Sequence, residues 1–506
     1  MKRILKYIFL AVGVIAVSSC DKGFDDLNTN KIAVTAIDPV FILNQSIIST
    51  SYPTETAVFD MGVVQQIISP NSGVLTGANF NQENRSVFGQ LWPQYYQNVI
   101  RNTKDVIIQV NESGDRNNLL QMARIIQAHA FMVLTDRYGD IPYSEAGIGF
   151  QEGVVLPKYD AQESVYQDII KELTEASAAL SASGKTEGAE ILYAGDVAKW
   201  KKLGYSLLLR AGMRLSEANP TAAQAAVSAA FAGGVMASND DNFVIRHDAN
   251  YQNPIGGMLN STEANNFFIP KPFIDQLKNT NDPRLASIAV RYVGASSGPG
   301  QTESAANRDP SVQIGLPMGN DNGGAGAAAS ADGLASFYAY SQIDRTRLAK
   351  NTSPMFLCTY AQTQLLLAEA AVKGWINGNA ENLYSSAIRA HMEQMALYNE
   401  ASAIADEDIQ TYVNANPLSG SNALADIGTQ YWIASLLNGP EAFANFRRTG
   451  FPALAPNPFP LKDISGDFIN RIPYQNSEIS VNSENVQAAI ARQGPDNMDT
   501  KVWWDK

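Results

Sequence analysis

The first feature of the chain is a stretch in which apolar side chains recur at three- and four-residue steps. It runs from Asn117 to Tyr138 with few polar interruptions. This period is typical of a helix, and the scarcity of polar positions indicates that most of its surface is buried. Its roughly twenty residues would span about 30 Å, so other helices must pack along it. Gly139 and Pro142 predict its end, because glycine closes helices in the left-handed conformation and proline lacks the N–H that would continue one.

The same helical period returns along most of the chain. It covers much of 39–112, 157–180, 194–230, 355–399 and 427–454. Asp160 followed by Glu163 matches a capping box, which predicts Asp160 as an N-cap. At the junction of two further helices, Asn219 is a candidate N-cap and Pro220 a candidate first helical residue. A short NGNAE turn within 355–399 indicates a helical hairpin. These patterns predict an all-α, mainly helical protein.

Two long polar stretches interrupt the helical pattern, at about 238–269 and 292–345. Both are rich in Asn, Gly, Ser or Ala. A structureless loop of this length within a compact domain is usually functional or disordered, and both interpretations are open. A shorter loop over residues 71–85 is predicted by its Gly and Asn content. Several aromatic rings lie in these polar stretches, where no helical face explains them: Phe80, Tyr251, Phe337, Tyr338 and Tyr340.

The first twenty residues have the pattern of a secretion signal. Lys2, Arg3 and Lys6 precede an apolar run, and small residues precede Cys20. The run is too short to span a bilayer as a mature helix. A cysteine directly after small residues resembles a lipobox, so we expect residues 1–19 to be cleaved and Cys20 to be acylated, for instance with palmitate. The alternative is an ordinary signal peptide whose cysteine is incidental.

Residues 20–37 are polar and suit a flexible tether, and residues 38–506 are predicted to form a single domain. If Cys20 carries lipid, Cys358 is the only other cysteine, so no internal disulfide is possible. The formal net charge is −13, and a chain this acidic will not hold nucleic acid electrostatically. No apolar stretch after residue 19 is long enough to cross a membrane.

One longer string points to a family. RIIQAHAFMVLTDRYGDIPYSEA, which begins at Arg124, resembles the signature helix of the SusD/RagB nutrient-binding outer-membrane lipoproteins of Bacteroidetes. The resemblance is to the SusD-like subgroup described as starch-binding and outer-membrane-associated. Further segments echo its pattern in order: PKYDAQESVYQDIIKEL, AGDVAKWKKLGYSLLLRAGMR, FFIPKPFIDQLKNTNDPRL, LLLAEAAVKGW, EAFANFRRTGFP and RIPYQNSEISVN. Two positions depart from the family pattern: Tyr205 stands where Asn is expected, and ASLLNG lacks an expected aromatic residue. Both lie in predicted helices, so they affect local packing rather than family membership.

The resemblance implies a scaffold of tetratricopeptide-like helical hairpins, with long irregular loops carrying the ligand site. A clean repeat of roughly 34 residues is not readable in the sequence itself. The resemblance further implies a lipid-anchored protein at the outer-membrane surface that delivers an oligosaccharide or other nutrient to a SusC-like TonB-dependent transporter. Some of the shared motifs look structural: Asp282 and Pro283 resemble a helix start, and Arg447 and Arg448 are expected to pair with acids.

A sugar-binding site needs aromatic faces for the sugar C–H groups and short polar side chains for the hydroxyls. The candidate ligand-binding residues are Asn79, Phe80, Trp92, Tyr251, Asn253, Phe337, Tyr338 and Tyr340. For each of them, burial under a neighbouring loop is the alternative interpretation.

Two other classes of protein are open. A glycoside hydrolase could draw a carboxylate pair from the 50 acidic residues. The sequence lacks H-E-x-x-H, G-x-S-x-G, phosphate-loop and C-x-x-C motifs, and its three histidines, His129, His247 and His391, are scattered. A surface adhesin or structural lid would share the anchor and helices but would have no saturable ligand. We expect a binding protein rather than an enzyme.

No cofactor motif is present. NDDN at 239–242 and NDNGG at 320–324 offer oxygen ligands for a structural calcium ion, but neither fits an EF-hand loop. No metal ligand is therefore assigned.

Overall fold

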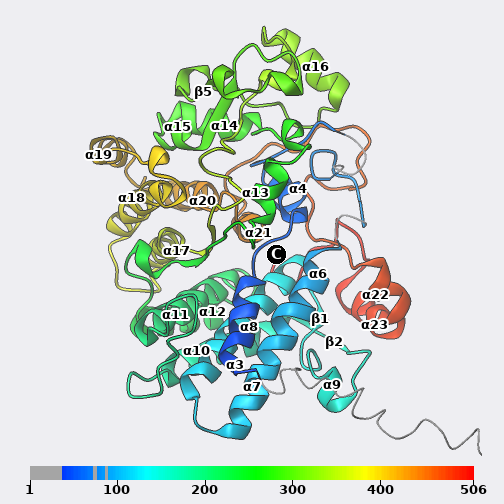
Figure 1. Cartoon of the computed structure of the whole chain (residues 1–506), viewed down its shortest axis with the longest axis vertical. Coiled ribbons are helices and arrows are strands. Elements are labelled where there is room, and N and C mark those ends of the chain that lie inside the picture. The colour runs from blue at the N-terminus through cyan, green and yellow to red at the C-terminus, as the bar shows by residue number, and fades with distance from the viewer. Residues whose placement is uncertain (1–36, 72–76, 86–88, 506) are drawn as a thin grey trace, which may run out of the picture. The chain divides into compact units, whose positions relative to one another are not determined.

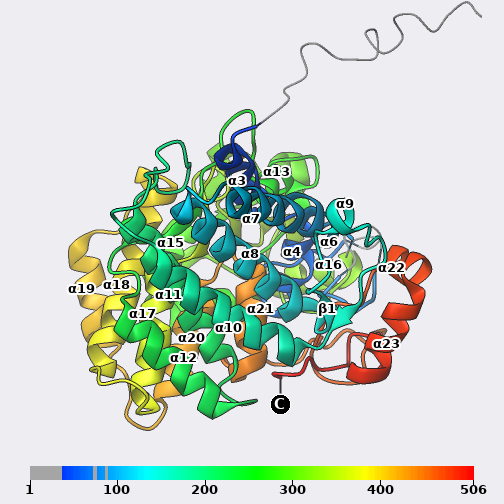
Figure 2. The same ribbon diagram turned by 90° about the horizontal axis from the view of Figure 1, so that it is seen from below.

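Helix α8 (Asn117–Tyr138) lies within a row of helices, each packed on the next (Figure 1, Figure 2). Helix α7 (Arg101–Ser113) packs on α8, and α8 packs on α10 (Gln162–Ala179), which packs on α11 (Val197–Arg214). Helix α11 packs on both α12 (Pro220–Gly233) and α17 (Tyr360–Val372), and α17 pairs with α18 (Ala380–Tyr398). This row is the tetratricopeptide-like scaffold of helical hairpins, and the all-α prediction is confirmed.

The computed structural model describes residues 37–71, 77–85 and 89–505. The chain divides into two units, Met1–Asp38 and Pro39–Lys506, and every element named below belongs to the second. The predicted signal segment 1–19 and Cys20 lie outside the described residues. Among the described residues, no helix is both long and apolar enough to traverse a bilayer.

The remaining longer helices are α3 (Pro39–Ile48), α19 (Asp406–Ala415), α20 (Ala423–Ala434), α21 (Gly439–Thr449) and α23 (Ser483–Gln493). The shorter helices and the Gly/Ala-rich α16 are α4 (Glu55–Val58), α5 (Asp60–Val63), α6 (Leu91–Gln94), α9 (Gly149–Glu152), α13 (Pro254–Leu259), α14 (Lys271–Asn279), α15 (Arg284–Ile288), α16 (Asn322–Ala331) and α22 (Asn476–Val481). Helix α6 continues as a π-helical turn, η1 (Tyr95–Ile100), into α7. Single 3₁₀ turns are η2 (Asn239–Asp241), η3 (Ala264–Asn266), η4 (Gly298–Gly300), η5 (Glu303–Ala305), η6 (Pro310–Val312), η7 (Phe337–Ala339) and η8 (Glu400–Ser402).

The described strands are short and antiparallel. They are β1 (Ile141–Pro142), β2 (Tyr159–Asp160), β3 (Phe243–Ile245), β4 (Ala289–Tyr292), β5 (Ala306–Asn307), β6 (Gln342–Ile343) and β7 (Met355–Cys358). Strand β1 pairs with β2, β3 with β7, and β4 lies between β5 and β6. Ile141 is opposite Asp160 in the first pair. These strands lie in the segments that connect the helices, and in the described residues they form sheets of two or three strands.

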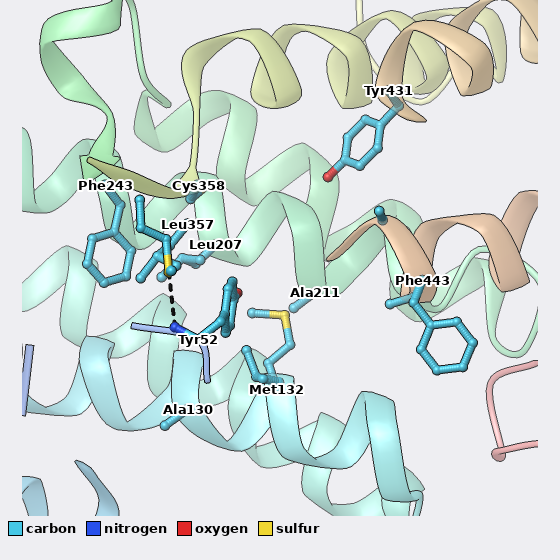
Figure 3. Packing of buried hydrophobic residues seen from close by; sticks show 14 of the residues in the cluster. Tyr52, Ala130, Met132, Leu207, Ala211, Phe243, Leu357, Cys358, Tyr431 and Phe443 are labelled. Carbon is cyan, nitrogen blue, oxygen red and sulfur yellow. Dashed lines mark hydrogen bonds between the residues drawn. The ribbon is translucent and has the colours of Figure 1, made fainter. Parts of the chain in front are cut away.

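The main core joins α8, α11 and the β3–β7 pair, as Figure 3 shows for Ala130, Leu207 and Phe243. In the same region the backbone N–H of Tyr52 donates to Met355 Sδ at 3.0 Å (Figure 3). The free thiol of Cys358 is buried there. Residues of α8 and α11 belong to this one core, and both helices are buried along most of their length.

Helix α8 ends where the sequence predicts. Gly139 has a φ of +79°, and its N–H bonds to the carbonyl of Thr135 at 2.8 Å. A Cβ at Gly139 would displace the Gln493 side chain, whose Oε1 it would overlap, and the positive φ favours glycine at this position. The predicted cap of α12 is also confirmed, since Asn219 Oδ1 accepts from the N–H of Ala222 at 3.1 Å.

The predicted start of α10 is wrong. The helix begins at Gln162, two residues after Asp160, and its N-cap Ala161 makes no side-chain cap. Asp160 instead lies in β2, where its carboxylate accepts from the N–H groups of Tyr143 and Ser144. The first turn is capped from a distance, because Asp140 Oδ1 accepts from the N–H of Gln162 at 2.8 Å. Tertiary contacts thus replaced the local capping box.

The stretch 292–345 is not structureless. It contains the helix α16, whose first turn is capped by Asp321 Oδ1 accepting from the N–H of Gly324 at 2.8 Å. Ala325 and Ala329 are buried in a small separate core together with Tyr340. Small side chains let this helix pack closely, which offsets the low helix propensity of its glycines.

The structure shows the contacts of three residues that the sequence analysis interpreted as structural: Asp282, Arg447 and Arg448. Helix α15 begins at Arg284, one residue later than predicted, and Asp282 accepts from both the N–H and the guanidinium of Arg284. Arg448 pairs with Glu369 as predicted, through two hydrogen bonds of 2.6 Å. The prediction for Arg447 is wrong, because its guanidinium donates to the backbone carbonyls of Asn470 and Asp136, each at 2.7 Å.

Candidate functional site

A cavity of about 740 Å³ opens between the start of α7, the segment 142–157 and helix α22. Its wall on the α7 side begins in α6 and the π-helical turn η1. Its volume falls within the roughly 300 to 1,000 Å³ range of small-molecule sites in proteins. It brings together parts of the chain that are distant in sequence.

Two aromatic residues, Trp92 and Tyr96, line the cavity as its floor, and three tyrosines that do not line it pack behind Trp92. The ring of Trp92 lies 4.8 Å from Tyr96 and 5.0 Å from Tyr138, centroid to centroid, and 6.1 Å from both Tyr159 and Tyr474. Trp92 is 5% exposed, and Tyr96 is half-buried. One of these pairs is tilted, two are edge-on, and Trp92 and Tyr159 are stacked, and together they hold the Trp92 ring in one orientation.

The tyrosine hydroxyls of this cluster are fixed by hydrogen bonds. Tyr96 donates to the carbonyl of Pro142 at 2.8 Å, and Tyr474 donates to the carbonyl of Asp140 at 2.6 Å. Tyr159 donates to Glu478 Oε2 at 2.8 Å. Burial raises the pKa of Tyr96 well above its ordinary value, and burial together with Glu478 raises that of Tyr159. These phenols therefore stay neutral, and the floor is rigid and uncharged.

The segment 147–157, which includes α9, forms one wall. Gly147 has a φ of +77°, and a Cβ there would lie 3.2 Å from Lys104 Cβ on α7, so the segment passes close over that helix. Its other end is tied to the chain around α22, where Asn482 Nδ2 donates to the carbonyl of Pro157 at 2.8 Å. Both ends of the wall are thus anchored.

The rim of the cavity is apolar and open to solvent. Val155 is 80% exposed, Leu156 48% and Val481 68%, and all three line the cavity. Exposed valine and leucine side chains are individually common on protein surfaces. Here they meet at the mouth of a site with an aromatic floor, which favours a ligand that has both apolar and polar faces.

The polar lining includes one cation, Arg101, and three acids, Asp105, Glu145 and Glu478. Glu145 accepts from the N–H of Lys158 at 2.9 Å. Gln475 is only 9% exposed, and its Nε2 finds no acceptor in the part of the chain that the structure describes. A buried donor without a partner is costly, and because Gln475 Nε2 is itself buried, it is not open to a ligand in the cavity.

The predicted ligand residues are distributed over several places. Trp92 lies in the floor of the cavity, and the other seven do not line it. Asn79 and Phe80 are buried. Asn79 donates to the carbonyls of Ser69 and Asn320, and the Phe80 ring packs 4.6 Å from that of Phe459. Both side chains are used within the protein in this structure.

Tyr251 and Asn253 lie near each other at the start of α13. The hydroxyl of Tyr251 donates to the carbonyl of Ile48 at 2.7 Å, and its ring stacks on His247. Asn253 caps α13 and donates to the carbonyl of Ser353 at 3.0 Å. These contacts give each residue a structural role.

Phe337 and Tyr338 stack on each other at 4.3 Å and are half-buried. Tyr340 is fully buried and donates to Asp332 at 2.7 Å. Contact of any of these loop residues with a ligand stays a prediction, and Phe337, Tyr338 and Tyr251 are the ones among them that are only half-buried.

Sequence reasoning missed Tyr96, Gln475 and Glu478. Tyr96 lies on a regular helical pattern, and Gln475 and Glu478 lie in RIPYQNSEISVN, a string that carries the family resemblance and has no ligand-binding signal of its own. No local signal separates these residues from ordinary helix positions. Only the approach of α22 to η1 and α7 places them in one cavity.

Two of the three acids proposed for calcium, Asp241 and Asp321, are engaged with protein donors. Asp241 accepts from Lys202 Nζ at 2.9 Å and from the N–H of Ala237 at 2.8 Å, and Asp321 caps α16. Within the described ranges, no group of three or more His, Cys, Asp or Glu side chains is arranged to hold a metal ion.

The comparisons with known proteins agree with one another. Residues 30–475 match the model of the SusD-like family described as "Starch-binding associating with outer membrane". A solved structure of a chitin-binding protein is similar at 31% identity and a TM-score of 0.82, covering 93% of this chain and all of its own. No curated protein matches the sequence.

Two further solved structures are similar. A Bacteroidetes SusD-like protein has 26% identity and a TM-score of 0.79, covering 93% of this chain and 100% of its own. A chitin-binding SusD homologue from Flavobacterium johnsoniae has 25% identity and a TM-score of 0.70, covering 94% of this chain and 96% of its own. These relatives are described as binding proteins and not as enzymes. With the family model matched over most of its length, the chain belongs to the SusD-like family of outer-membrane-associated binding proteins.

Proposed function

We propose that this protein is a non-catalytic glycan-binding protein of the outer-membrane surface, and that it holds an oligosaccharide in the cavity floored by Trp92. The observation that carries the proposal is the combination of an aromatic floor, an amide and carboxylate lining and a volume of about 740 Å³. Aromatic faces suit the C–H groups of sugar rings, and side-chain amides and carboxylates suit the hydroxyls. The descriptions of the relatives as starch-binding and chitin-binding support the same class of ligand.

The proposal also covers how the protein is attached to the membrane and with which partner it acts. We infer that Cys20 is acylated and that the protein acts with a SusC-like TonB-dependent transporter, to which it delivers the bound oligosaccharide. The lipobox-like sequence before Cys20 supports the anchor, and the family resemblance supports the transporter. Cys20→Ala is expected to release the protein from the membrane fraction. If the variant stays in the outer-membrane pellet, the lipid is dispensable for placement.

Isothermal titration of the purified protein with starch-type and chitin-type oligosaccharides tests the binding site. Val481→Asp puts a charge on the exposed rim of the cavity, and we expect it to weaken binding about tenfold without changing the melting temperature. Val293→Asp is the matched control, because Val293 is 47% exposed and does not line the cavity. Equal binding by the two variants would place the ligand elsewhere, with Phe337 and Tyr338 as the next positions to test.

The same samples separate the rival classes of protein. Release of reducing sugar above background would show a glycoside hydrolase and contradict the proposal. The absence of a saturable response to every oligosaccharide, also with the transporter present, would favour an adhesin or a structural lid.

A further inference from the structure

We infer that the glycan site continues beyond the cavity described above into a second cavity, so that its ligand is an oligosaccharide chain that crosses the turn 143–147. The inference rests on the proposed glycan-binding function and deepens it. The second cavity has a volume of about 460 Å³ and is lined by α7, α8 and α10, which follow one another in the row of helices (Figure 2). Ala146 lines both cavities, so they meet at this residue.

Helix α7 presents a different face to each cavity. Arg101 and Asp105 line the first cavity, whereas Lys104 and Asn111 line the second. Residues four or seven apart lie on the same face of a helix, and a step of three residues moves to the neighbouring face. A ligand that enters both cavities therefore passes across the surface of α7, where the turn 143–147 lies.

The turn 143–147 separates the two cavities on top of α7. Gly147 passes close over the helix, since a Cβ there would lie 3.2 Å from Lys104 Cβ. Ser144 is exposed and lines the second cavity, and the next residue, Glu145, is half-buried and lines the first. Because neighbouring residues of the turn line different cavities and keep surface in solvent, a chain molecule can run over the turn from one cavity to the other.

The turn is fixed before any ligand arrives. Asp160 Oδ2 accepts from the N–H of Tyr143 at 3.2 Å and from the N–H of Ser144 at 2.8 Å. The N–H of Ala146 donates to the carbonyl of Tyr143 at 3.2 Å. Binding does not have to order this part of the chain, which lowers the entropic cost of a ligand that bridges the two cavities.

The second cavity offers an aromatic surface. The half-buried ring of Tyr143 lines it and lies 4.5 Å from the ring of Phe131, centroid to centroid. The hydroxyl of Tyr143 donates to Asp168 Oδ2 at 2.7 Å. Burial, together with the Asp168 carboxylate, raises the pKa of Tyr143, so the phenol stays neutral. A fixed, neutral ring suits the C–H groups of a sugar.

The second cavity also holds two donors without a protein partner. Lys104 is half-buried and Asn111 is exposed, and neither side chain makes a hydrogen bond or an ion pair within the described ranges. The carboxylate of Glu172 in the same cavity already accepts from Arg124, at 2.7 and 3.1 Å. The free amine and amide are therefore available to the hydroxyl oxygens of a neutral sugar chain.

Two connected cavities make affinity depend on chain length. A short oligosaccharide can occupy the first cavity alone, where Trp92 forms the floor. A longer chain held there brings its next sugars to the second cavity at high effective concentration, and the contacts made there add to its affinity. The gain that comes from length should therefore depend on Lys104 and Asn111.

The test is titration calorimetry of the purified protein with the dimer and the hexamer of α-1,4-linked glucose and of β-1,4-linked N-acetylglucosamine. Lys104→Met keeps the aliphatic stem beneath Gly147 and removes the amine, and Asn111→Ala removes the amide. We expect the double variant to bind the hexamer about tenfold more weakly than the parent and to bind the dimer equally well. Its melting temperature should stay unchanged, because neither group has a partner among the described residues.

Lys201→Met is the matched control. Lys201 is a half-buried lysine of α11 that makes no hydrogen bond or ion pair with the described residues and lines neither cavity. This variant should keep the parent affinity for both lengths. An unchanged ratio of hexamer to dimer affinity in the double variant would overturn the inference.

Equal losses for dimer and hexamer in the double variant would also overturn it, because the whole ligand would then lie in the second cavity. If the ratio is unchanged and Val481→Asp weakens both lengths, the proposed glycan-binding function survives without the extension. Failure of the unmodified protein to bind any of the four oligosaccharides would overturn both.

Discussion

The hydroxyl of Tyr159 donates to Glu478 Oε2 at 2.8 Å and thereby joins β2 to α22 beside the cavity. Tyr159 is buried, whereas Glu478 is half-buried and can be rehydrated if its partner is lost. Replacing Tyr159 with Phe keeps the ring and removes only this hydrogen bond. We expect a loss of about 1 kcal/mol in the free energy of unfolding, measured by urea denaturation.

The same variant should loosen α22. Amide hydrogen exchange within Asn476–Val481 is expected to become faster, because β2 no longer holds the helix through Glu478. Exchange in α8 should stay unchanged, since its core contacts are intact. Unaltered exchange in α22 would show that Asn482 and the backbone hold the helix without Tyr159.

The buried pair of Arg448 and Glu369 ties α21 to α17 through two hydrogen bonds of 2.6 Å. Glu369→Ala leaves the guanidinium buried without its acid, and should lower the free energy of unfolding by about 3 to 5 kcal/mol. The double variant Glu369→Leu with Arg448→Met removes both charges. Its cost in a denaturant titration should be clearly smaller than that of Glu369→Ala, and a larger cost would mean that the pair itself supplies net stability.

Stability should fall as the pH drops below about 6.5, the ordinary pKa of histidine, and His129 contributes to this fall. Burial, with a smaller effect of Arg210, lowers the pKa of His129 to about 3. Between these values the unfolded chain binds a proton at this position and the folded protein does not, so acidification favours unfolding. Going from pH 6.5 to 4.5 should cost about 2 to 3 kcal/mol from this residue alone.

His129→Leu provides the comparison for this pH effect. Neither ring nitrogen of His129 has a partner among the described residues, so an apolar side chain of similar size is expected to be tolerated at pH 8. The difference in unfolding free energy between variant and parent, followed from pH 8 to 4.5, isolates His129 from the carboxylates and the other histidines. A difference that does not change with pH would contradict the assignment.

Phe80 and Tyr338 should respond differently to truncation. Phe80 is 2% exposed and packs on Phe459, so Phe80→Ala is expected to cost about 3 to 5 kcal/mol of stability. Tyr338 is half-buried and stacked on Phe337, so Tyr338→Ala should cost about 1 kcal/mol. Thermal denaturation of the two variants measures this. A small loss for Phe80→Ala would return that ring to the candidates for ligand contact.

The sequence by itself determined the helical scaffold of this protein. The period of α8, its end at Gly139 and the Asn219 cap of α12 are local features, and helix formation depends on neighbours within one or two turns. The local pattern gave wrong predictions where residues distant in sequence determine the structure. Asp140 rather than Asp160 caps α10, and burial of Ala325 and Ala329 makes a helix of a Gly-rich stretch.

Only the tertiary structure decided the candidate site. Trp92, Glu145 and Gln475 lie in three segments separated by tens to hundreds of residues, and no pattern in the chain reports that they line one cavity. The sequence also does not show that Gln475 Nε2 is buried without a hydrogen-bond acceptor, because that depends on which groups surround it in the folded protein. Periodicity fixes which residues face inward along one helix, whereas a cavity is defined by the surfaces that several packed segments leave uncovered.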